Sequence, residues 1–436
     1  MKEIKFGIIG FGTVGSGVVK LFLENKEEIN KRLGFKLTLK KIAEKQLTSK
    51  VGIVVPPEML TSEAYDIIND PEIDIVVELV GGTTIAKQFI LDALKNKKHV
   101  ITANKALLSE FGEEIFNIAS KSGSYLGFEA SVGGVIPIIK TIKENLAGDK
   151  IESVCGIMNG TCNYILTRMS EEKKDFDEIL AEAQKKGYAE ANPALDIEGI
   201  DAAHKLTILT SLAFGTNVNF KDIYYEGIKD ITNLDIDFAY DFDYVIKLLG
   251  IARDRGDAIE AKVHPTLIPK DHPLASVRME YNAIYIKGVG CGSMLLYGKG
   301  AGMMPTASAV LGDIIDCARH INTNSIGTIS NRGYLEEHLI NKPIKPLEEI
   351  KSKFYIRLIV EDKPGVLASI SGILGQRSIS IESVVQKGRD EKGKGVPLVI
   401  FTHETKEKEL KIALNSIEKF AFCLSKPLVI RIEEDI

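Results

Sequence analysis

The first 130 residues alternate short apolar strands with helices, and this alternation constrains the fold more than any other feature. Strands are expected at 4–9, 37–43, 74–79, 98–102 and 124–128, and the helices between them include 13–28, 84–95 and 113–120. Such an order predicts right-handed crossovers and a parallel sheet covered by helices on both faces. We therefore expect an open α/β domain at residues 1–130.

A glycine-rich turn joins the first strand to the first helix. Residues 10–15 have the pattern G-x-G-x-x-G. The first glycine allows the tight turn, the second lets the backbone approach a pyrophosphate, and the third allows close helix–strand packing. The alternative is a turn that only packs, but the strand–turn–helix context favours a Rossmann-type dinucleotide site. Its predicted residues are Gly10, Phe11, Gly12, Thr13, Val14 and Gly15.

The end of the second strand does not choose between NAD and NADP. Glu44 would accept hydrogen bonds from a ribose 2′-hydroxyl, whereas Lys45, together with Lys50, would favour a 2′-phosphate. We therefore expect both nicotinamide cofactors to work.

Beyond residue 130 the strict alternation stops. Residues 131–330 mix helices with longer strands, which is typical of an α+β domain, and the helix expected at 303–320 is assigned back to the nucleotide domain. Residues 331–350 are polar and contain two prolines, so they are interpreted as a linker. Residues 351–436 follow the order strand, helix, strand, strand, helix, strand, which predicts a ferredoxin-like βαββαβ domain.

Composition narrows the function classes. The apolar runs fall well short of the ~20 residues that span a bilayer, so no membrane partner is expected. The formal net charge of −5 argues against nucleic acid as a partner. Five scattered cysteines indicate neither a disulfide framework nor a zinc cluster. The start of the chain shows no signal-peptide pattern, and we expect a cytoplasmic protein.

Lys105 follows the strand expected at 98–102. Ligands of open α/β sheets bind at the carboxyl edge of the strands, so Lys105 is a candidate functional residue. The alternative is an ordinary solvated lysine.

A second cluster of charged residues lies on one expected helix. This helix is predicted to begin at an N-cap, Asp196, and to stop at Gly215, with Asp201 and Lys205 four residues apart on one face. Residues 206–214 carry no charge, so the helix is expected to be buried with its charges at the end that faces a cleft. The alternative is an exposed ion pair at a frayed helix start, worth about 0.3–0.5 kcal/mol.

Taken together, the motifs resemble the homoserine dehydrogenase family along essentially the whole chain, in the form with an appended ACT regulatory domain. The matching stretches are 10–15, 104–105, 129–137, 156–164, 187–190, 196–205, 247–250 and 297–302. The resemblance implies reversible, NAD- or NADP-dependent interconversion of L-aspartate 4-semialdehyde and L-homoserine, on the route to threonine, methionine and isoleucine. It also implies a catalytic and dimerisation domain at 131–330, and hence a homodimer or larger homo-oligomer.

The resemblance implies roles for individual residues. Lys205 would donate the proton to the carbonyl oxygen as hydride arrives, and Lys105 would contact both cofactor and substrate. Glu190 would bind substrate, while Asp196 and Asp201 would hold substrate and lysines. These roles agree with the chemistry, because an ammonium group both stabilises and protonates an oxygen that gains negative charge.

Two further sites are implied by the resemblance. Glu129, Val132, Gly134 and Ile136 match the family's monovalent-cation loop, in which mainly backbone carbonyls bind sodium; the alternative is a tight Gly-Gly turn. Gly302 matches the position at which the returning chain contacts the cofactor, close to Lys299, which replaces a frequent arginine.

The turn that opens the first helix of the C-terminal domain resembles the Asp-x-Pro-Gly turn of ACT domains. Its amide N–H groups suit an amino-acid carboxylate, and Asp362 suits the ammonium group. The expected effector is threonine, bound by Asp362, Gly365, Val366 and Leu367 and coupled to a dimer interface. The alternative is a proline-initiated helix in a module that only oligomerises.

Two other functions stay open. An acylating semialdehyde dehydrogenase would use Cys155 or Cys162 as nucleophile, although no pairing histidine is evident and His204 is expected to pack or hydrogen-bond. A catalytically inactive sensor of nucleotide and amino acid would not need to keep the predicted lysines and acids.

Overall fold

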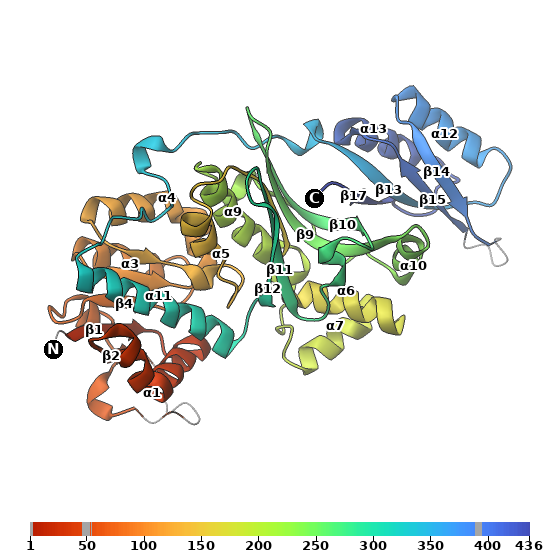
Figure 1. The fold of residues 1–436 in the computed structure, drawn as a ribbon. Helices are drawn as coiled ribbons and strands as arrows, with labels where there is room; N and C mark the ends of the chain where they lie inside the picture. The colour runs from red at the N-terminus through yellow and green to blue at the C-terminus, as the bar shows by residue number, and fades with distance from the viewer. Residues whose placement is uncertain (1–2, 46–52, 54, 389–394) are drawn as a thin grey trace. The chain divides into compact units, whose positions relative to one another are not determined.

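The computed structural model describes residues 3–45, 53, 55–388 and 395–436 (Figure 1). The chain divides into two compact units. The first comprises Met1–Val154, His204–Asp222 and Tyr281–Lys342, and the second comprises Cys155–Ala203, Ile223–Glu280 and Pro343–Ile436. No helix within the described ranges has the length and apolar character that a membrane span needs.

A parallel sheet organises the first unit. Its strand order is β3 (Leu60–Thr61), β2 (Lys36–Ala43), β1 (Glu3–Ile9), β4 (Ile75–Glu78), β5 (His99–Thr102) and β6 (Leu126–Gly127). Each neighbouring pair is parallel. The order reverses beside β1, where open α/β sheets bind ligands. The Rossmann-type α/β prediction is confirmed.

Helices cover this sheet and extend its core. They include α1 (Thr13–Leu33), α2 (Tyr65–Ile68), α3 (Ile85–Lys95), α4 (Lys105–Ser122) and the late α11 (Met303–Thr323). One hydrophobic cluster joins residues of β1, α1 and β2 to Ala307, Val310 and Ile314 of α11. The helix expected at 303–320 therefore packs within the nucleotide-binding unit. The unit also contains the antiparallel hairpin β11 (Tyr281–Gly288) and β12 (Gly292–Lys299).

Long strands form the centre of the second unit. β9 (Tyr244–Asp254) and β10 (Ile259–Pro269) are antiparallel along their whole length, and the short β8 (Tyr224–Tyr225) pairs with β10. The helices of this unit include α6 (Gly160–Glu172), α7 (Phe176–Lys185), α8 (Ala194–Ile197) and α10 (Asn233–Asp241). Strand β7 (Ile151–Ile157) and helix α9 (Ile200–Phe214) each belong in part to both units.

The prediction that Asp196 caps the helix of Lys205 is wrong. Asp196 lies inside the short helix α8, and α9 begins only at Ile200. Gly199, with a φ of 85°, separates the two helices, and this left-handed conformation strongly favours glycine. The predicted stop is in place, since Gly215 follows the last residue of α9.

The C-terminal module has the predicted βαββαβ order. Its elements are β13 (Lys351–Val360), α12 (Val366–Gln376), β14 (Ile381–Gln386), β15 (Val396–Thr402), α13 (Glu407–Ile417) and β17 (Leu428–Ile432), with the short β16 (Thr405–Lys406) paired to β13. The buried side chains of these elements form one hydrophobic cluster. The fold prediction for this region is confirmed.

This module also shares a sheet with the rest of the second unit. Strand β17 pairs antiparallel with β13 on one side and parallel with β10 on the other, with Thr266 opposite Arg431. This pairing gives hydrogen-bond partners to backbone groups of β17 that would be unpaired at the sheet edge of an isolated module. The segment 331–350 is ordered: Ile340 bridges Thr216 in the first unit, and Ile344 bridges Ile259 in the second.

Candidate functional site

The turn between β1 and α1 has the geometry that a dinucleotide requires. A Cβ added at Gly10 would lie 2.7 Å from the carbonyl carbon of Leu79, and one at Gly15 would lie 2.1 Å from the carbonyl oxygen of Gly10. At Gly12, by contrast, no described heavy atom outside its chain neighbours lies within 4 Å of an added Cβ. Gly12 is therefore open to a pyrophosphate at the N-terminus of α1. The other predicted residues of the turn are Phe11, which is buried, Thr13, which is exposed, and Val14, which is half-buried.

Glu44 lies directly beside this turn. Its Oε2 accepts a hydrogen bond from the backbone N–H of Phe11 at 2.8 Å. Lys45, the next residue, is exposed, and Lys50 lies outside the described residues. An acid and a cation thus both stand at the end of β2 beside the turn, and the use of both cofactors stays a prediction.

Helix α11 begins immediately after Gly302 and contacts α1. A Cβ added at Gly17 would lie 2.9 Å from the side chain of Met303, so the two helices touch within the second turn of α1. Gly302 therefore lies close to the glycine turn. This agrees with the position that the family resemblance implies for the contact between the returning chain and the cofactor.

A buried glutamate braces the neighbouring loop, and sequence reasoning missed it. Glu78 ends β4 with no exposed surface; its carboxylate accepts hydrogen bonds from Thr102 Oγ1 (2.8 Å) and from the N–H groups of Val80 (2.8 Å) and Gly81 (3.2 Å). Burial raises the pKa of Glu78, although these hydrogen bonds oppose the shift. An acid within an otherwise apolar strand was the signal that could have revealed it.

Asn104 connects the same loop to the helix of Lys105. Its Oδ1 accepts the N–H of Leu107 at 3.1 Å and so caps α4, while its Nδ2 donates to the carbonyl of Gly82 at 2.7 Å. Lys105 is the first residue of α4 and is half-buried. The predicted position of Lys105 at the carboxyl edge of the parallel sheet agrees with the structure.

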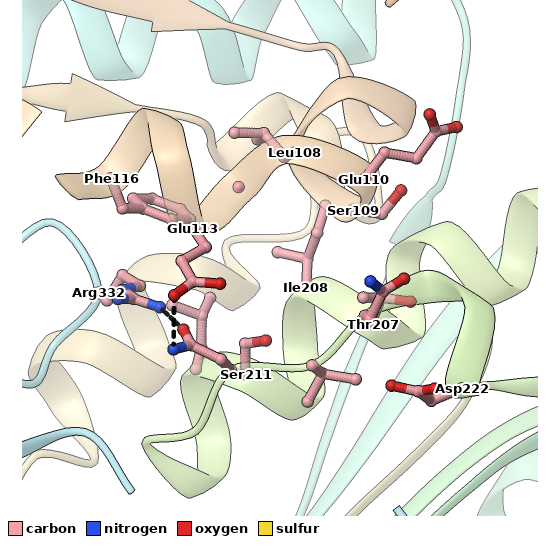
Figure 2. A pocket seen from close by; sticks show the side chains of 15 residues that line it. Leu108, Ser109, Glu110, Glu113, Phe116, Thr207, Ile208, Ser211, Asp222 and Arg332 are labelled. Atoms are coloured by element: carbon pink, nitrogen blue, oxygen red, sulfur yellow. Dashed lines mark hydrogen bonds between the residues drawn. The ribbon is translucent and has the colours of Figure 1, made fainter. Parts of the chain in front are cut away.

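Helices α4 and α9 line a common cavity of about 170 Å³ (Figure 2). The lining begins at Leu108, three residues after Lys105, and at Thr207, two residues after Lys205. The cavity is bordered by a hydrogen-bonded chain in which Asn217 joins Glu113 to the buried Arg332. The two helices that carry the predicted lysines are therefore neighbours within the first unit.

Lys205 lies on the helix that sequence analysis expected to be buried. Its side chain is only 6% exposed, and the residues that follow it, Leu206–Phe214, are buried apart from Ser211, which is half-buried. Asp201, one turn earlier, is buried as well. The alternative for these residues was an ion pair at an exposed, frayed helix start. Their burial contradicts that alternative.

Asp196 and Asp201 meet at one side chain. Asn159 Nδ2 donates to Asp196 Oδ1 at 2.7 Å and to Asp201 Oδ2 at 2.8 Å. Thr161 Oγ1 contacts Asp196 Oδ2 at 3.2 Å. Sequence reasoning grouped the two acids but missed Asn159, although it lies in one of the stretches that carry the family resemblance.

Glu190 lies in an exposed loop whose backbone is tied to the same cluster. Thr161 Oγ1 donates to the carbonyl of Tyr188 at 2.8 Å, and Gln184 Nε2 donates to the carbonyl of Glu190 at 3.1 Å. These bonds hold the loop through its backbone. Glu190 lies two residues after Tyr188, whose carbonyl binds Thr161. Because Thr161 also contacts Asp196, the loop of Glu190 is linked to the two acids.

The cysteines and the histidine of this region are packed. Cys155 is fully buried, and burial raises the pKa of its thiol; Cys162 is also buried, and its Sγ donates to the carbonyl of Asp196 at 3.1 Å. The ring of His204 packs on Phe220 with a centroid distance of 4.4 Å. Reactive thiols need a lowered pKa and access, which the environment of Cys155 does not provide.

The predicted cation loop is a tight turn against the hairpin β11–β12. The carboxylate of Glu129 accepts the N–H groups of Ile139 (2.7 Å) and Lys140 (2.8 Å), and the carbonyl of Ile136 accepts the N–H of Ile138 at 2.8 Å. A Cβ added at Gly134 would lie 2.6 Å from the carbonyl oxygen of Lys299. The predicted Val132 is fully buried in the same loop.

The ligand atoms that this loop offers are oxygens, from its backbone carbonyls and from the carboxylate of Glu129. Within the described part of the chain, no group of three or more His, Cys, Asp and Glu side chains is placed to hold a metal. Asn282 of β11 is buried next to Gly300, and neither atom of its amide has a hydrogen-bond partner among the described residues. Carbonyl groups and an unsatisfied amide oxygen fit a hard monovalent cation better than a transition metal.

The ACT-like turn opens helix α12. Gly365 is the N-cap of α12, Val366 is buried at its start and Leu367 is 45% exposed. Asp362 Oδ1 accepts a hydrogen bond from Gln386 Nε2 of β14 at 3.3 Å. The four predicted effector residues thus surround one exposed helix start.

A Rossmann-ordered sheet, an open glycine turn and lysines on neighbouring helices define the class of NAD(P)-dependent oxidoreductases. Family models agree: the NAD-binding domain of homoserine dehydrogenase matches residues 10–129, the homoserine dehydrogenase domain matches 137–315 and the ACT domain matches 354–422. The chain belongs to the homoserine dehydrogenase family.

Two relatives are similar over the full length of this chain, and a third is similar over about three quarters of it. The homoserine dehydrogenase of Pseudomonas aeruginosa is 43% identical over 434 residues, with both chains covered completely. The crystal structure of a homoserine dehydrogenase from Thiobacillus denitrificans superposes with a TM-score of 0.94 at 43% identity, covering 100% of this chain and 99% of the other. A hyperthermophilic archaeal homoserine dehydrogenase in complex with NADPH covers 72% of this chain and 98% of its own, with a TM-score of 0.62 at 26% identity.

Proposed function

We propose that this chain reduces L-aspartate 4-semialdehyde to L-homoserine reversibly, with Lys205 as the proton donor. The observation that carries this proposal is the buried Lys205 at the head of the uncharged run 206–214 of α9, next to the helix of Lys105. The nicotinamide cofactor, NADP or NAD, supplies or accepts the hydride. The pathway toward threonine, methionine and isoleucine follows from this reaction.

The side chains divide the remaining work. The backbone at Gly12 receives the pyrophosphate, because this glycine is the open position of the turn. Lys205 donates its proton to the aldehyde oxygen as negative charge develops there, and burial of its helix excludes competing water. Lys105 binds the substrate beside the cofactor.

The acids complete the substrate site. Glu190 and Asp196 bind the substrate's ammonium group, and Asp201, on the same face of α9 as Lys205, orients the lysine and the substrate. Both alternatives are disfavoured: Cys155 is buried with a raised pKa, and an inactive sensor has no need of a buried lysine.

Replacement of the proton donor tests the proposal. Lys205→Met should lower kcat by about 10²–10⁴-fold, the usual contribution of a general acid, while the Kd for NADPH stays within about twofold. Absorbance of NADPH with aspartate semialdehyde measures the rate. Lys121→Met, at an exposed lysine in the last turn of α4, is the matched control. A kcat close to that of the parent in Lys205→Met would reject the assignment.

We also propose that threonine binds at the start of α12 and inhibits the enzyme. The exposed helix start receives the carboxylate, and Asp362 receives the ammonium group. Because β17 is shared with β10, a point change is a cleaner test than deletion of the module. Asp362→Ala should abolish inhibition by threonine without changing kcat. Full inhibition of that variant would contradict the site.

Two further assignments belong to the same proposal. Sodium would be held by the backbone carbonyls of residues Glu129, Val132, Gly134 and Ile136, where it would rigidify the turn. The chain would form a homodimer; in support, the hairpin strand β12 exposes Leu295 and Tyr297. Activity in sodium-free buffer and sedimentation of the full chain test these two assignments.

A further inference from the structure

We propose that Asn159 is a positioning residue that holds Asp196 and Asp201 together as a preformed pair of carboxylates. This inference rests on the proposed roles of the two acids. The structure places them on different helices, α8 and α9, with the left-handed Gly199 between them. One amide nitrogen therefore bridges two helices that Gly199 separates.

The geometry uses both hydrogens of the amide. Nδ2 donates to Asp196 Oδ1 at 2.7 Å and to Asp201 Oδ2 at 2.8 Å, distances typical of hydrogen bonds to charged acceptors. Asn159 is 3% exposed and Asp201 is 8% exposed, so little water competes for the bond between them, whereas Asp196 is half-buried. Two carboxylates gathered so closely repel each other, and hydrogen bonds to their charged forms offset that repulsion.

The orientation of the amide is fixed from the other side. Oδ1 of Asn159 accepts the N–H of Cys162 at 2.8 Å, so the residue is the N-cap of α6. Only an oxygen can accept that bond, so the nitrogen must face the acids. The start of α6 thus sets the direction in which the two donors point.

A neutral donor suits this position better than a charged one. Lysine or arginine would neutralise the carboxylates and compete with the substrate's own ammonium group. The amide uses one lone-pair site on each carboxylate and leaves their charge available. Thr161 Oγ1, which contacts the second oxygen of Asp196 at 3.2 Å, adds a further neutral contact from the same helix.

Asn159→Ser separates the positioning role from the capping role. Serine is as good an N-cap as asparagine, but its hydroxyl is too short to reach both acids. We expect the melting temperature to stay within a few degrees, the kcat/KM for aspartate semialdehyde to fall about 30-fold, and the Kd for NADPH to stay within about twofold. Asn30→Ser is the matched control, since Asn30 also accepts a backbone N–H, from Leu37, outside the site.

Asn159→Asp is the second variant and keeps the test valid if serine impairs folding. It retains an oxygen for the cap but adds a third carboxylate, so it should lower kcat/KM more than serine does. A kcat/KM within twofold of the parent in either soluble variant would overturn the inference. The inference would also fail if the losses of kcat/KM only paralleled the losses of melting temperature, because Asn159 would then be a purely structural residue.

A double-mutant cycle distinguishes this inference from the proposed function. If Asn159 acts through the acids, Asn159→Ser should lower kcat/KM less in an Asp196→Asn background than in the parent, with the bond to Asp201 accounting for the remaining effect. Full additivity would overturn the inference. If Asp196→Asn and Asp201→Asn each retain parental kcat/KM, the proposed roles of the acids fail. If Asp196→Asn and Asp201→Asn lose activity but Asn159→Ser does not, only the role proposed for Asn159 is rejected.

Discussion

Two buried glutamates, one in each unit, are stabilised in opposite ways. Glu78 of the nucleotide-binding sheet accepts its hydrogen bonds, within the described part of the chain, from neutral donors, and burial raises its pKa. Glu433 follows β17 and forms ion pairs with Lys262 (2.9 Å) and Arg253 (2.8 Å). Burial alone would raise the pKa of Glu433, but the two cations outweigh burial and lower it.

The difference reflects what each region does. Glu78 braces a loop near the site proposed for an anionic cofactor, where a weakly charged carboxyl avoids repulsion of phosphate. Glu433 fastens the C-terminal module to the long strand β10, where Lys262 is only 1% exposed. Buried charges need partners, so this junction is part of the fold of the second unit rather than a loose tether.

The largest expected effect is at the junction. Glu433→Ala should destabilise the protein by about 3–5 kcal/mol, because it leaves the buried Lys262 and the half-buried Arg253 without this partner. Urea unfolding measures the loss. Glu434→Ala is the control, since the neighbouring side chain is 37% exposed in its ion pair with Lys353 and its removal should cost about 1 kcal/mol or less. Equal losses in the two variants would show that the junction does not depend on buried pairing.

A smaller effect is expected at the nucleotide-binding sheet. Glu78→Gln should change stability by about 1 kcal/mol or less at pH 7, because the amide oxygen still accepts the N–H groups of Val80 and Gly81. The same unfolding measurement compares it with Glu433→Gln, which loses a charge that two cations require. A larger loss in Glu78→Gln than in Glu433→Gln would reverse the comparison.

Local signals in the sequence were sufficient for the regular parts of the fold. The strand–turn–helix context of residues 10–15 predicted the open glycine turn, and the uncharged run 206–214 predicted a buried helix, since each depends on neighbours along the chain. The βαββαβ module was predictable for the same reason. The N-cap assigned to Asp196 failed because Gly199 ends one helix and starts another within a single pattern.

Long-range contacts were beyond sequence reasoning. Asn159 reaches acids that are 37 and 42 positions away, and its amide looks like any polar residue until the helices are placed. The pairing of β17 with β10 joins strands separated by about 160 residues, and no periodicity records it. Glu78 and Glu433 were missed together because a single acid in an apolar stretch does not show whether cations or amides surround it.

The smallest effects lie in the pH dependence of stability, and their signs differ between the two acids. A carboxyl whose pKa is raised in the folded state binds more protons there than in the unfolded chain, so its contribution falls as the pH rises above about 4.5. Glu78→Gln lacks this group and should gain stability relative to the parent between pH 4.5 and 7.5.

Glu433 should behave in the opposite way. Its pKa is lowered in the folded state, so its contribution is present above about pH 4.5 and is lost as the pH falls through the folded pKa. The deficit of Glu433→Gln relative to the parent should therefore shrink on acidification from pH 5 to pH 3. Thermal melts of the parent and the two variants across pH 3–7.5 measure both slopes. Parallel curves for Glu78→Gln and the parent would mean that Glu78 is charged in the folded protein and that neutral donors alone can hold a buried carboxylate.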